Sequence, residues 1–385
     1  MMQTQIVVPS TSAVPLHSHI YRQFPYKTML SLSSFLALLT LATTVSPSAS
    51  LSSLAPPSRS TSNKSSASIL DPTKLFSKHQ KAKSNNALSS LFQQSQKNII
   101  LTYLEINGWL ITLNGVTILL DPILEGPLDF GIPDLYKGTK RVLPNYGILE
   151  DSCLASLVDA VVLTQGLEDH AHVQSLTKLH RALPASVPIL APPSAKGALK
   201  ASGFLEGNGA SVQFLKHGED FTVAATTTKS SNDSSSPSVN IRATTGALVG
   251  PPWQTRENGY VMRASNNGPT LYTEPHVEFQ ADELQSLLGG TGVDVCLSPI
   301  SGFGIGGYEL VHGPTDTLDL LQTIQPRFLV PMRNGEIDFE GPLAKVVSPV
   351  GSSEEFQSLL QQKGTDISTQ LVDALPGQDV VLKCA

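Results

Sequence analysis

The stretch Asp159-Ala160-Val161-Val162-Leu163-Thr164-Gln165-Gly166-Leu167-Glu168-Asp169-His170 joins an apolar run to a polar one. Four consecutive apolar residues are typical of a strand that is buried on both faces, and we expect this strand to end at Thr164. A short loop then follows, and a helix is predicted to begin near His170. The side chains able to do chemistry (Gln165, Asp169 and His170) therefore come directly after a buried strand.

The segments on either side contain further strands and helices. Three short β-rich runs precede the stretch at 99–104, 109–113 and 116–120, and Asn114-Gly115 between the last two predicts a two-residue hairpin turn. Further strands are expected at 187–191, 211–215, 239–244, 259–264, 270–273, 293–297, 327–331 and 379–383. Helices are expected at 149–157, 170–183, 194–202, 281–288, 315–324 and 353–362.

An opening β-meander followed by alternating strands and helices predicts an α+β domain in which two sheets pack face to face with helices outside. We place this domain at residues 98–385, a length sufficient for one large core. Within it, the serine-rich segment Thr228–Ser238 is predicted to be a disordered hairpin tip. No segment of the domain is apolar and long enough to span a membrane.

The strand, the loop and the loop length of residues 159–170 resemble the metallo-β-lactamase superfamily, whose hallmark at such a strand end is Thr-His-x-His-x-Asp-His. In that motif two histidines bind one metal, while the Asp and the last His bind a second. The resemblance implies a four-layer αβ/βα sandwich and a metal-dependent hydrolase of an ester, lactone or phosphoester. In this chain Asp169 and His170 match the last two members of the motif.

Shorter segments in the same order extend the resemblance over nearly all of residues 99–383 and indicate the lactonase-like branch of metal-dependent hydrolases. Val116–Leu124 resembles that branch's ILIDP strand, and Ile189–Pro193 resembles its next strand. Arg256–Tyr260 resembles the segment before its Gly-Asp-Thr strand. His312–Pro314 resembles a Met-Gly-Pro helix start, and Leu329–Gly335 resembles a VIPMHYG strand.

The departures from the family motif affect the metal ligands. The first two motif histidines are replaced by Gln165 and Leu167, and a leucine side chain cannot ligate a metal. A third histidine is absent from Thr245–Leu248, where the family carries it. The bridging Asp of the family aligns with His276, and its last His aligns with Arg333 or Asn334. The resemblance therefore implies that the standard two-zinc site cannot form.

Three interpretations of the remaining residues stay open. In the first, Asp169, His170 and His276, joined by Glu274, hold one zinc or other divalent metal and leave an open position for water. The chain is then a metal-dependent hydrolase in which Asp169 and His170 act as metal ligand or base. In the second, no metal binds, and the chain is a non-catalytic ligand-binding or interaction protein.

In this second interpretation, the guanidinium of Arg333 occupies the cationic position within ion-pair distance of Asp169, in a pocket for an anionic or carbonyl ligand. A buried carboxylate that has lost its metal is costly unless it is paired, which favours this arrangement. The pocket residues are then Gln165, Glu274, Trp253 and Asn334. In the third interpretation, the same residues are satisfied buried polar groups in a site that has lost its function.

Two segments lie where the family has the mouth of its active site. Gly250–Gln254 is stiffened by two prolines, and Trp253 within it is either a cover for a ligand or a packing residue. Ser301–Tyr308 is rich in glycine, but it does not open a helix after a strand as a dinucleotide-binding loop does. We therefore predict that it is a flexible lid over the pocket.

The first hundred residues differ in charge from the rest of the chain. They hold nine Lys or Arg and one acid, whereas the remainder holds 17 basic and 31 acidic residues. Residues 1–70 contain 17 serines and no acid, and Ser34–Val45 resembles the apolar part of a signal peptide. We interpret residues 1–97 as a plastid (chloroplast) targeting peptide with a disordered linker, the alternatives being a secretory signal and an untargeted tail.

The remaining composition excludes several classes of protein. Three cysteines that lie far apart do not make a disulfide scaffold or a zinc knuckle. A net charge of −6 argues against bulk nucleic-acid binding. We expect a soluble, acidic mature protein without a membrane span, whose partner is a small-molecule ligand or substrate.

Overall fold

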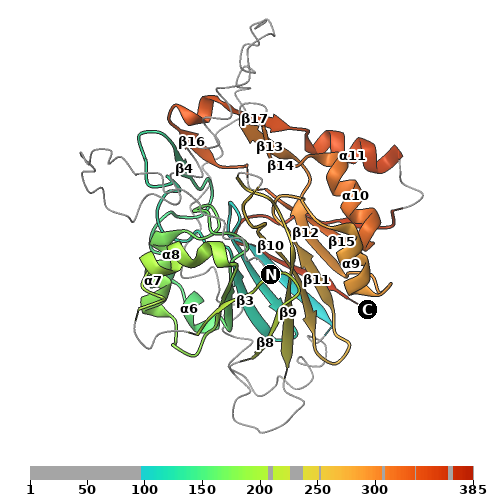
Figure 1. Ribbon diagram of the computed structural model, residues 1–385, viewed down its shortest axis with the longest axis horizontal. Coiled ribbons are helices and arrows are strands. Elements are labelled where there is room, and N and C mark those ends of the chain that lie inside the picture. The colour runs from blue at the N-terminus through green and yellow to red at the C-terminus, as the bar shows by residue number, and fades with distance from the viewer. Residues whose placement is uncertain are drawn as a thin grey trace, which may run out of the picture.

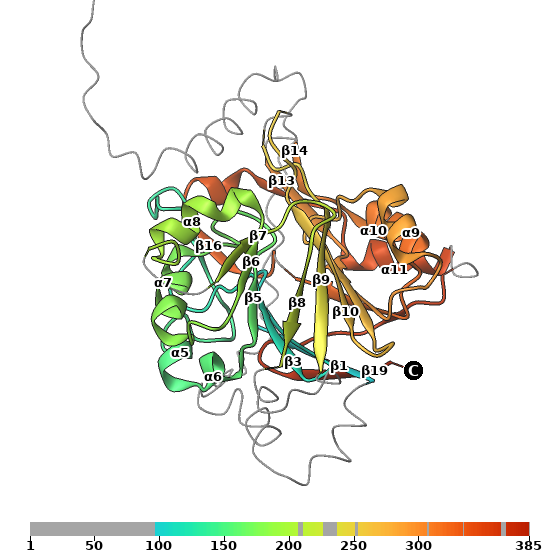
Figure 2. The same ribbon diagram turned by 60° about the horizontal axis from the view of Figure 1, so that its bottom comes forward.

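The computed structural model describes residues 97–206, 211–225, 237–250, 253–305, 308–333, 335–362 and 367–384. Two seven-stranded sheets lie face to face, and helices cover the outer face of each sheet, as Figure 1 and Figure 2 show. The predicted α+β class and four-layer αβ/βα sandwich are therefore confirmed. Among these residues, no helix combines the length and apolar character that a membrane crossing requires.

The first sheet has the order β19-β1-β2-β3-β5-β6-β7. Its first four strands pair antiparallel, and β3, β5, β6 and β7 pair parallel. The strands are β1 (Asn98–Tyr103), β2 (Trp109–Leu113), β3 (Val116–Leu120), β5 (Ala160–Val162), β6 (Ile189–Ala191), β7 (Val212–Phe214) and β19 (Asp379–Lys383).

The second sheet has the order β18-β15-β12-β11-β10-β9-β8, again with a parallel and an antiparallel half. Its strands are β8 (Asp220–Ala224), β9 (Ser238–Thr245), β10 (Asn258–Ala264), β11 (Thr270–Thr273), β12 (Val295–Pro299), β15 (Phe328–Met332) and β18 (Gln370–Leu371). Because parallel strands end at one edge, the loops after β3 and β5 gather at one edge of the first sheet. Those after β11, β12 and β15 gather at one edge of the second.

Helices pack on the outer face of each sheet. The first sheet is covered by α5 (Ile148–Asp151), α6 (Leu154–Leu157), α7 (Val173–Ala182) and α8 (Lys196–Ala201), with the 3-10 turn η1 (Pro193–Ala195). The second sheet is covered by α9 (Ala281–Leu288), α10 (Pro314–Ile324) and α11 (Ser353–Gln362).

Two smaller sheets have the strand orders β14-β13-β17 and β16-β4. Their strands are β4 (Lys137–Thr139), β13 (Gly302–Ile305), β14 (Tyr308–Val311), β16 (Asp338–Glu340) and β17 (Val347–Val350), and η3 (Leu343–Lys345) lies between β16 and β17.

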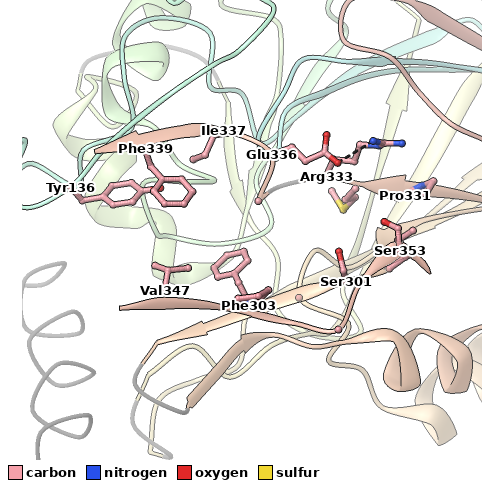
Figure 3. Close-up of a pocket in the computed structure, with 16 residues that line it drawn as sticks. Tyr136, Ser301, Phe303, Pro331, Arg333, Glu336, Ile337, Phe339, Val347 and Ser353 are labelled. Carbon is pink, nitrogen blue, oxygen red and sulfur yellow. Dashed lines mark hydrogen bonds and ion pairs between the residues drawn. The ribbon is translucent and has the colours of Figure 1, made fainter. Parts of the chain in front are cut away.

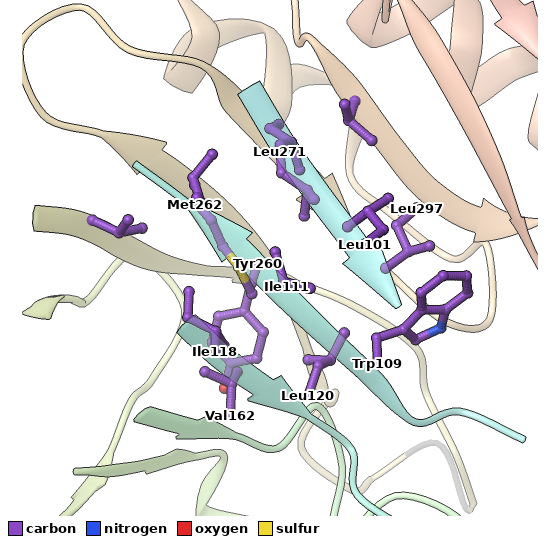
Figure 4. Close-up of a cluster of buried hydrophobic side chains, with 14 of the residues drawn as sticks. Leu101, Trp109, Ile111, Ile118, Leu120, Val162, Tyr260, Met262, Leu271 and Leu297 are labelled. Atoms are coloured by element: carbon purple, nitrogen blue, oxygen red, sulfur yellow. The ribbon is translucent and has the colours of Figure 1, made fainter. Parts of the chain in front are cut away.

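Three apolar clusters correspond to the three interfaces between these four layers. The cluster between the sheets includes Trp109, Tyr260 and Leu297, all fully buried, and Figure 4 shows side chains of both sheets meeting there. A second cluster joins the first sheet to α5–α8, and a third joins the second sheet to α9–α11. Burial of this apolar surface is the main force that stabilises the sandwich.

Most of the predicted elements are present in the structure. The hairpin turn is confirmed, since Asn114 and Gly115 both have positive φ, 51° and 77°. Three predicted elements differ from the structure. The helix predicted from His170 begins only at Val173, and the helix predicted at 149–157 is split into α5 and α6. In the segment Ser301–Tyr308, predicted to be a flexible lid, Gly302–Ile305 form β13 and Tyr308 begins β14, while positions 306 and 307 lie outside the described residues. The leader before Lys97 and most of Thr228–Ser238 lie outside the described residues, so the domain boundary stays a prediction.

Candidate functional site

Three loops that follow β3, β5 and β11 bring the polar side chains together. Asp121 comes directly after β3, Thr164 follows β5, and Glu274 follows β11. All three are completely buried, so their polar atoms need partners inside the protein. The residues Asn107, Asp121, Thr164, Gln165, Asp169, His170, Glu274 and His276 are called the polar cluster below.

His170 lies at the centre of the polar cluster and is held through its Nδ1 atom. Nδ1 lies 2.8 Å from Oδ2 of Asp121 and 2.9 Å from the hydroxyl of Thr164. Asp121 also accepts the backbone N–H of Thr164 at 2.7 Å and its hydroxyl at 2.6 Å. Because a carboxylate only accepts hydrogen bonds, Nδ1 of His170 carries a proton and donates it to Asp121. The strand end after β3 thus orients the imidazole ring.

The other ring nitrogen of His170 faces Asp169 and Asn107. Nε2 lies 3.4 Å from Oδ2 of Asp169 and 3.1 Å from Nδ2 of Asn107, which also donates to the backbone oxygen of Asp169. Burial by itself lowers the pKa of His170, but the carboxylates of Asp169 and Asp121 outweigh it and raise the pKa to about 10. The two carboxylates therefore favour the imidazolium form of His170. In the same way, burial of Asp169 opposes its ionisation, but His170 holds the pKa of this carboxyl below its usual value.

The loops that carry the polar cluster hold several residues in the left-handed region of backbone space. Asp121 has φ of 41°, and Glu105 and Ile106, which precede Asn107, have φ of 68° and 59°. Val277, which follows His276, has φ of 59°, a rare conformation for a β-branched residue. Such strain persists only where the surroundings enforce it, and it concentrates at functional sites. Its presence on three loops around His170 indicates that the fold still enforces a defined geometry here.

His276 and Glu274 form the side of the cluster that belongs to the second sheet. Glu274 Oε2 accepts the backbone N–H groups of His276 and Glu278 at 3.0 and 2.7 Å. The ring centroids of His276 and His170 are 5.6 Å apart. Burial and the charge of His170 lower the pKa of His276 to about 3, while burial raises the pKa of Glu274 to about 8. At neutral pH both side chains are therefore uncharged.

Six buried polar atoms of the cluster have no hydrogen-bond partner among the described residues. They are Asn107 Oδ1, Gln165 Oε1, Gln165 Nε2, Asp169 Oδ1, Glu274 Oε1 and His276 Nδ1. Such atoms are rare in folded proteins, and each costs about 1–3 kcal/mol when nothing binds it. Donors and acceptors are both present, so the cluster has unused capacity for a polar guest.

A metal ion does not fit the donor set of this cluster. Nδ1 of His170 is committed to Asp121, and its Nε2 faces Asp169 and Asn107. Gln165 and Leu167 stand where the family has two imidazoles. In the part of the chain that the structure describes, no three His, Cys, Asp or Glu side chains are arranged to hold a metal. Of the predicted ligand trio of Asp169, His170 and His276, only His276 offers an open ring nitrogen, Nδ1, and a divalent cation bound by the trio needs a second one from His170.

The predicted ion pair between Arg333 and Asp169 is wrong. The guanidinium of Arg333 pairs with Glu336 at 3.0 Å and with Asp373 at 2.7 Å, and Figure 3 shows it beside Glu336. Among the described residues it makes no ion pair with Asp169, whose cationic partner is His170. The physical reason is that the carboxylates of Glu336 and Asp373 lie nearer and pair with the guanidinium at the surface, where the Arg333 side chain is 33% exposed. The cationic position of the polar cluster is occupied by His170.

One predicted pocket residue is not brought to the polar cluster. Trp253 is 84% exposed on the surface loop before β10, which does not place it over the buried residues. Asn334 lies outside the described residues. Sequence reasoning also missed Asn107 and Asp121 as partners of His170. An Asp that directly follows a buried strand, as in Asp121-Pro122, was the available signal for one of them.

A family model for the beta-lactamase superfamily domain matches residues 100–333. Among solved structures, the metallo hydrolase Igni18 from the archaeon Ignicoccus hospitalis aligns with 75% of this chain and 100% of its own at 16% identity and a TM-score of 0.48. A possible metal-dependent hydrolase from Veillonella parvula aligns over 74% and 99% at 17% identity and a TM-score of 0.48. The metallo-beta-lactamase fold protein YhfI from Bacillus subtilis aligns over 74% and 100% at 11% identity and a TM-score of 0.45. No curated protein gave a significant match.

Proposed function

Because the chain belongs to the beta-lactamase superfamily, we propose that it is a metal-free member that binds a small polar molecule in the polar cluster. The ligand replaces the metal-bound water and substrate that such a strand edge would otherwise hold. The protein in this proposal keeps the fold and the buried site but uses them for binding.

The single observation that carries this proposal is the set of six unpartnered buried atoms on residues of the polar cluster. A retired site would relax until its polar groups were paired or exposed, because unpaired burial is unfavourable. Here the strained loops at Asp121 and Val277 keep the groups in place instead. A ligand with both donors and acceptors would satisfy them.

The charges of the cluster restrict the chemistry of this ligand. One imidazolium, His170, faces two carboxylates, Asp121 and Asp169, so the cluster already carries an excess of negative charge. With Arg333 paired elsewhere, the one cation that the described residues supply to the cluster is His170, which already faces both carboxylates. The amide of Gln165, with both polar atoms unpartnered, can donate to a carbonyl oxygen and accept from an amide N–H. We therefore propose an uncharged ligand that contains an amide or a carbonyl together with an N–H or O–H donor.

Metal analysis of the full chain tests the metal-free state. After expression in medium containing zinc, manganese and iron, we expect less than about 0.1 metal per chain and no loss of thermal stability on chelation, because the imidazoles are missing. The double variant Gln165→His and Leu167→His restores two imidazoles and should bind about one zinc per chain. Gln165→Asn and Leu167→Met, which changes the same positions without adding imidazole, is the control and should remain metal-free.

Mass spectrometry of small molecules released from the denatured full chain tests the ligand itself. We expect an uncharged amide or carbonyl compound that is carried by the wild type and lost from Gln165→Leu. A wild type that retains no such compound after mild purification, or a compound retained equally by Gln165→Leu, would contradict binding in the polar cluster.

A second candidate function is metal-dependent hydrolysis of an ester, lactone or phosphoester. One observation favours it, since Asp121 holds Nδ1 of His170 as outer carboxylates hold metal-binding histidines. In this case Asp169, His170 and His276 would bind the metal once Nε2 of His170 carried no proton. About one metal per wild-type chain, lost in His276→Ala, would favour this function over the first.

We also propose that residues 1–97 direct the protein to a plastid. The support is compositional, since this segment is basic, rich in serine and contains a single acid. A fusion of residues 1–97 to a fluorescent protein should enter the plastids of algal or plant cells. Export of the fusion would favour the secretory alternative, and a diffuse cytosolic signal would contradict both addresses.

A further inference from the structure

A cavity of about 330 Å³ lies beside the ends of β12 and β15, and none of its lining residues belongs to the polar cluster. Its volume is at the lower end of the range for small-molecule pockets. It is bounded by the sheet β14-β13-β17 on one side and by the β16–β4 pair on the other. The cavity is thus a second feature of the same end of the molecule, built from different residues.

Aromatic rings face this cavity from both sides. The rings of Tyr136 and Phe339 are stacked, with centroids 6.4 Å apart and planes inclined by 18°. In Figure 3, Phe303 and Val347 lie across the open space from these two rings. Aromatic rings therefore line two opposite walls of the cavity, which is called the slot below. Aromatic walls favour an aromatic guest, because rings attract one another in stacked and in edge-to-face arrangements.

The backbone fixes the position of Phe303 in this slot. It lies between Gly302 and Gly304 on β13, and a Cβ atom at these glycines would come within 1.9 Å of Val311 O and 2.5 Å of Tyr308 O. Only glycine therefore allows β14 to approach β13 so closely. This close pairing explains the glycine-rich motif of the sequence as a way of presenting Phe303 on a short, ordered strand.

The polar end of the slot offers hydroxyl groups and no unpaired charge. Ser301 and Ser353 line the cavity, and neither hydroxyl has a hydrogen-bond partner among the described residues. Among the described residues, the charged side chains that line it are Arg333 and Glu336, which pair with each other at 3.0 Å. A charged ligand would have to compete with this pair, whereas a hydroxyl or carbonyl group could bind the two serines directly.

We propose that this cavity is a binding site for a flat, uncharged aromatic molecule that carries a hydroxyl or carbonyl group at one end. The ring lies between Phe303 and the Tyr136–Phe339 pair, and the polar group reaches Ser301 and Ser353. This site and the polar cluster share no residue, although Tyr136 of the cavity lies within electrostatic reach of Asp169. It therefore adds a second ligand class to the amide or carbonyl compound proposed for the cluster.

Binding of 2-naphthol to the full chain, followed by calorimetry or by the fluorescence of the probe, tests the site. We expect saturable one-to-one binding, with decahydro-2-naphthol and 2-naphthoate each bound about tenfold more weakly, since the first is not flat and the second is charged. Wild-type protein that shows no saturable binding up to about 1 mM would overturn the proposal. Equal binding of the flat and the saturated probe would overturn it as well.

Variants then locate the bound probe. Phe303→Ala should weaken 2-naphthol binding about tenfold and Phe303→Leu, which keeps most of the volume, about threefold. Tyr146→Ala removes an aromatic ring that is 58% exposed and does not line the cavity, so it should leave binding unchanged. A Phe303→Leu variant that has the melting temperature of the wild type and binds 2-naphthol equally well would refute the site. Gln165→Leu should bind 2-naphthol normally, which separates this site from the polar cluster.

Discussion

The buried carboxylate of Asp121 lies 2.8 Å from Nδ1 of His170, and both side chains are completely shielded from solvent. Asp121 follows a strand of the meander and His170 follows the next parallel strand, so this pair ties two strand ends together across the edge of the first sheet. The same carboxylate satisfies the backbone N–H of Thr164. One charged group therefore supports the ring orientation and the loop that leads to it.

Asp121→Asn should destabilise the protein strongly. The change removes the negative charge that faces a buried imidazolium, and breaking one side of a buried pair typically costs about 3–5 kcal/mol. The unfolding free energy from urea denaturation at pH 7 measures the loss. Thr164→Val removes only a neutral hydroxyl from the same group and should cost about 1 kcal/mol. Similar losses for the two variants would mean that His170 is uncharged.

His170 and His276 should carry opposite charge states although their ring centroids are only 5.6 Å apart. The carboxylates of Asp169 and Asp121 raise the pKa of His170 to about 10, while burial and the charge of His170 lower the pKa of His276 to about 3. At pH 8, proton–nitrogen correlation spectra of the imidazole rings should therefore show an imidazolium for His170 and a neutral ring for His276. Single His→Gln variants assign the two signals. A neutral His170 at pH 8 would contradict this picture and would reopen metal binding.

The fold could be read from the sequence because its signals are local or ordered along the chain. The β-rich meander, the turn at Asn114-Gly115 and the strand before Thr164 each depend on neighbouring residues. The replacement of motif histidines by Gln165 and Leu167 was equally visible. These features predicted the sandwich and a site at the edge of the first sheet.

The contacts inside the site could not be read in the same way. Asp373 lies 40 residues from Arg333 in the chain, and only the folded loop after β18 brings it to 2.7 Å. Asn107 reaches His170 because the backbone at Glu105 and Ile106 takes positive φ, which side-chain type alone does not predict. Pairings of this kind depend on tertiary geometry, so the sequence assigned Arg333 to the wrong carboxylate.

Lys140→Met should stabilise the protein at neutral pH. The ammonium of Lys140 is buried without a hydrogen-bond partner among the described residues, and burial lowers its pKa to about 8 despite the carboxylates of Glu105 and Glu125. Replacing it by an apolar side chain of similar length should raise the unfolding free energy by about 1–3 kcal/mol at pH 7.

The pH dependence of the Lys140→Met effect follows from the direction of the shift. The folded pKa lies below the ordinary lysine value, so the unfolded chain binds more protons between about pH 8 and pH 10.5 and wild-type stability rises over that window. The advantage of the variant should therefore shrink as the pH rises. Lys178→Met is the control, since its amine pairs with Glu125 and Glu150 and its loss should lower stability by about 1 kcal/mol. A Lys140→Met protein less stable than wild type at pH 7 would show that this amine has an unrecognised partner.

A double-mutant cycle should show that Arg333 and Asp169 are energetically independent. Arg333 pairs with Glu336 and Asp373, whereas Asp169 pairs with His170, so the two share no partner. Arg333→Ala and Asp169→Asn should therefore add within about 0.5 kcal/mol in the unfolding free energy. Arg333→Ala with Asp373→Ala is the matched comparison, and this partly exposed pair should show a coupling of up to about 1 kcal/mol. A coupling energy that is larger for the Arg333–Asp169 pair than for the Arg333–Asp373 pair would mean that Arg333 is the cation of the polar cluster. The charge argument for an uncharged ligand would then no longer hold.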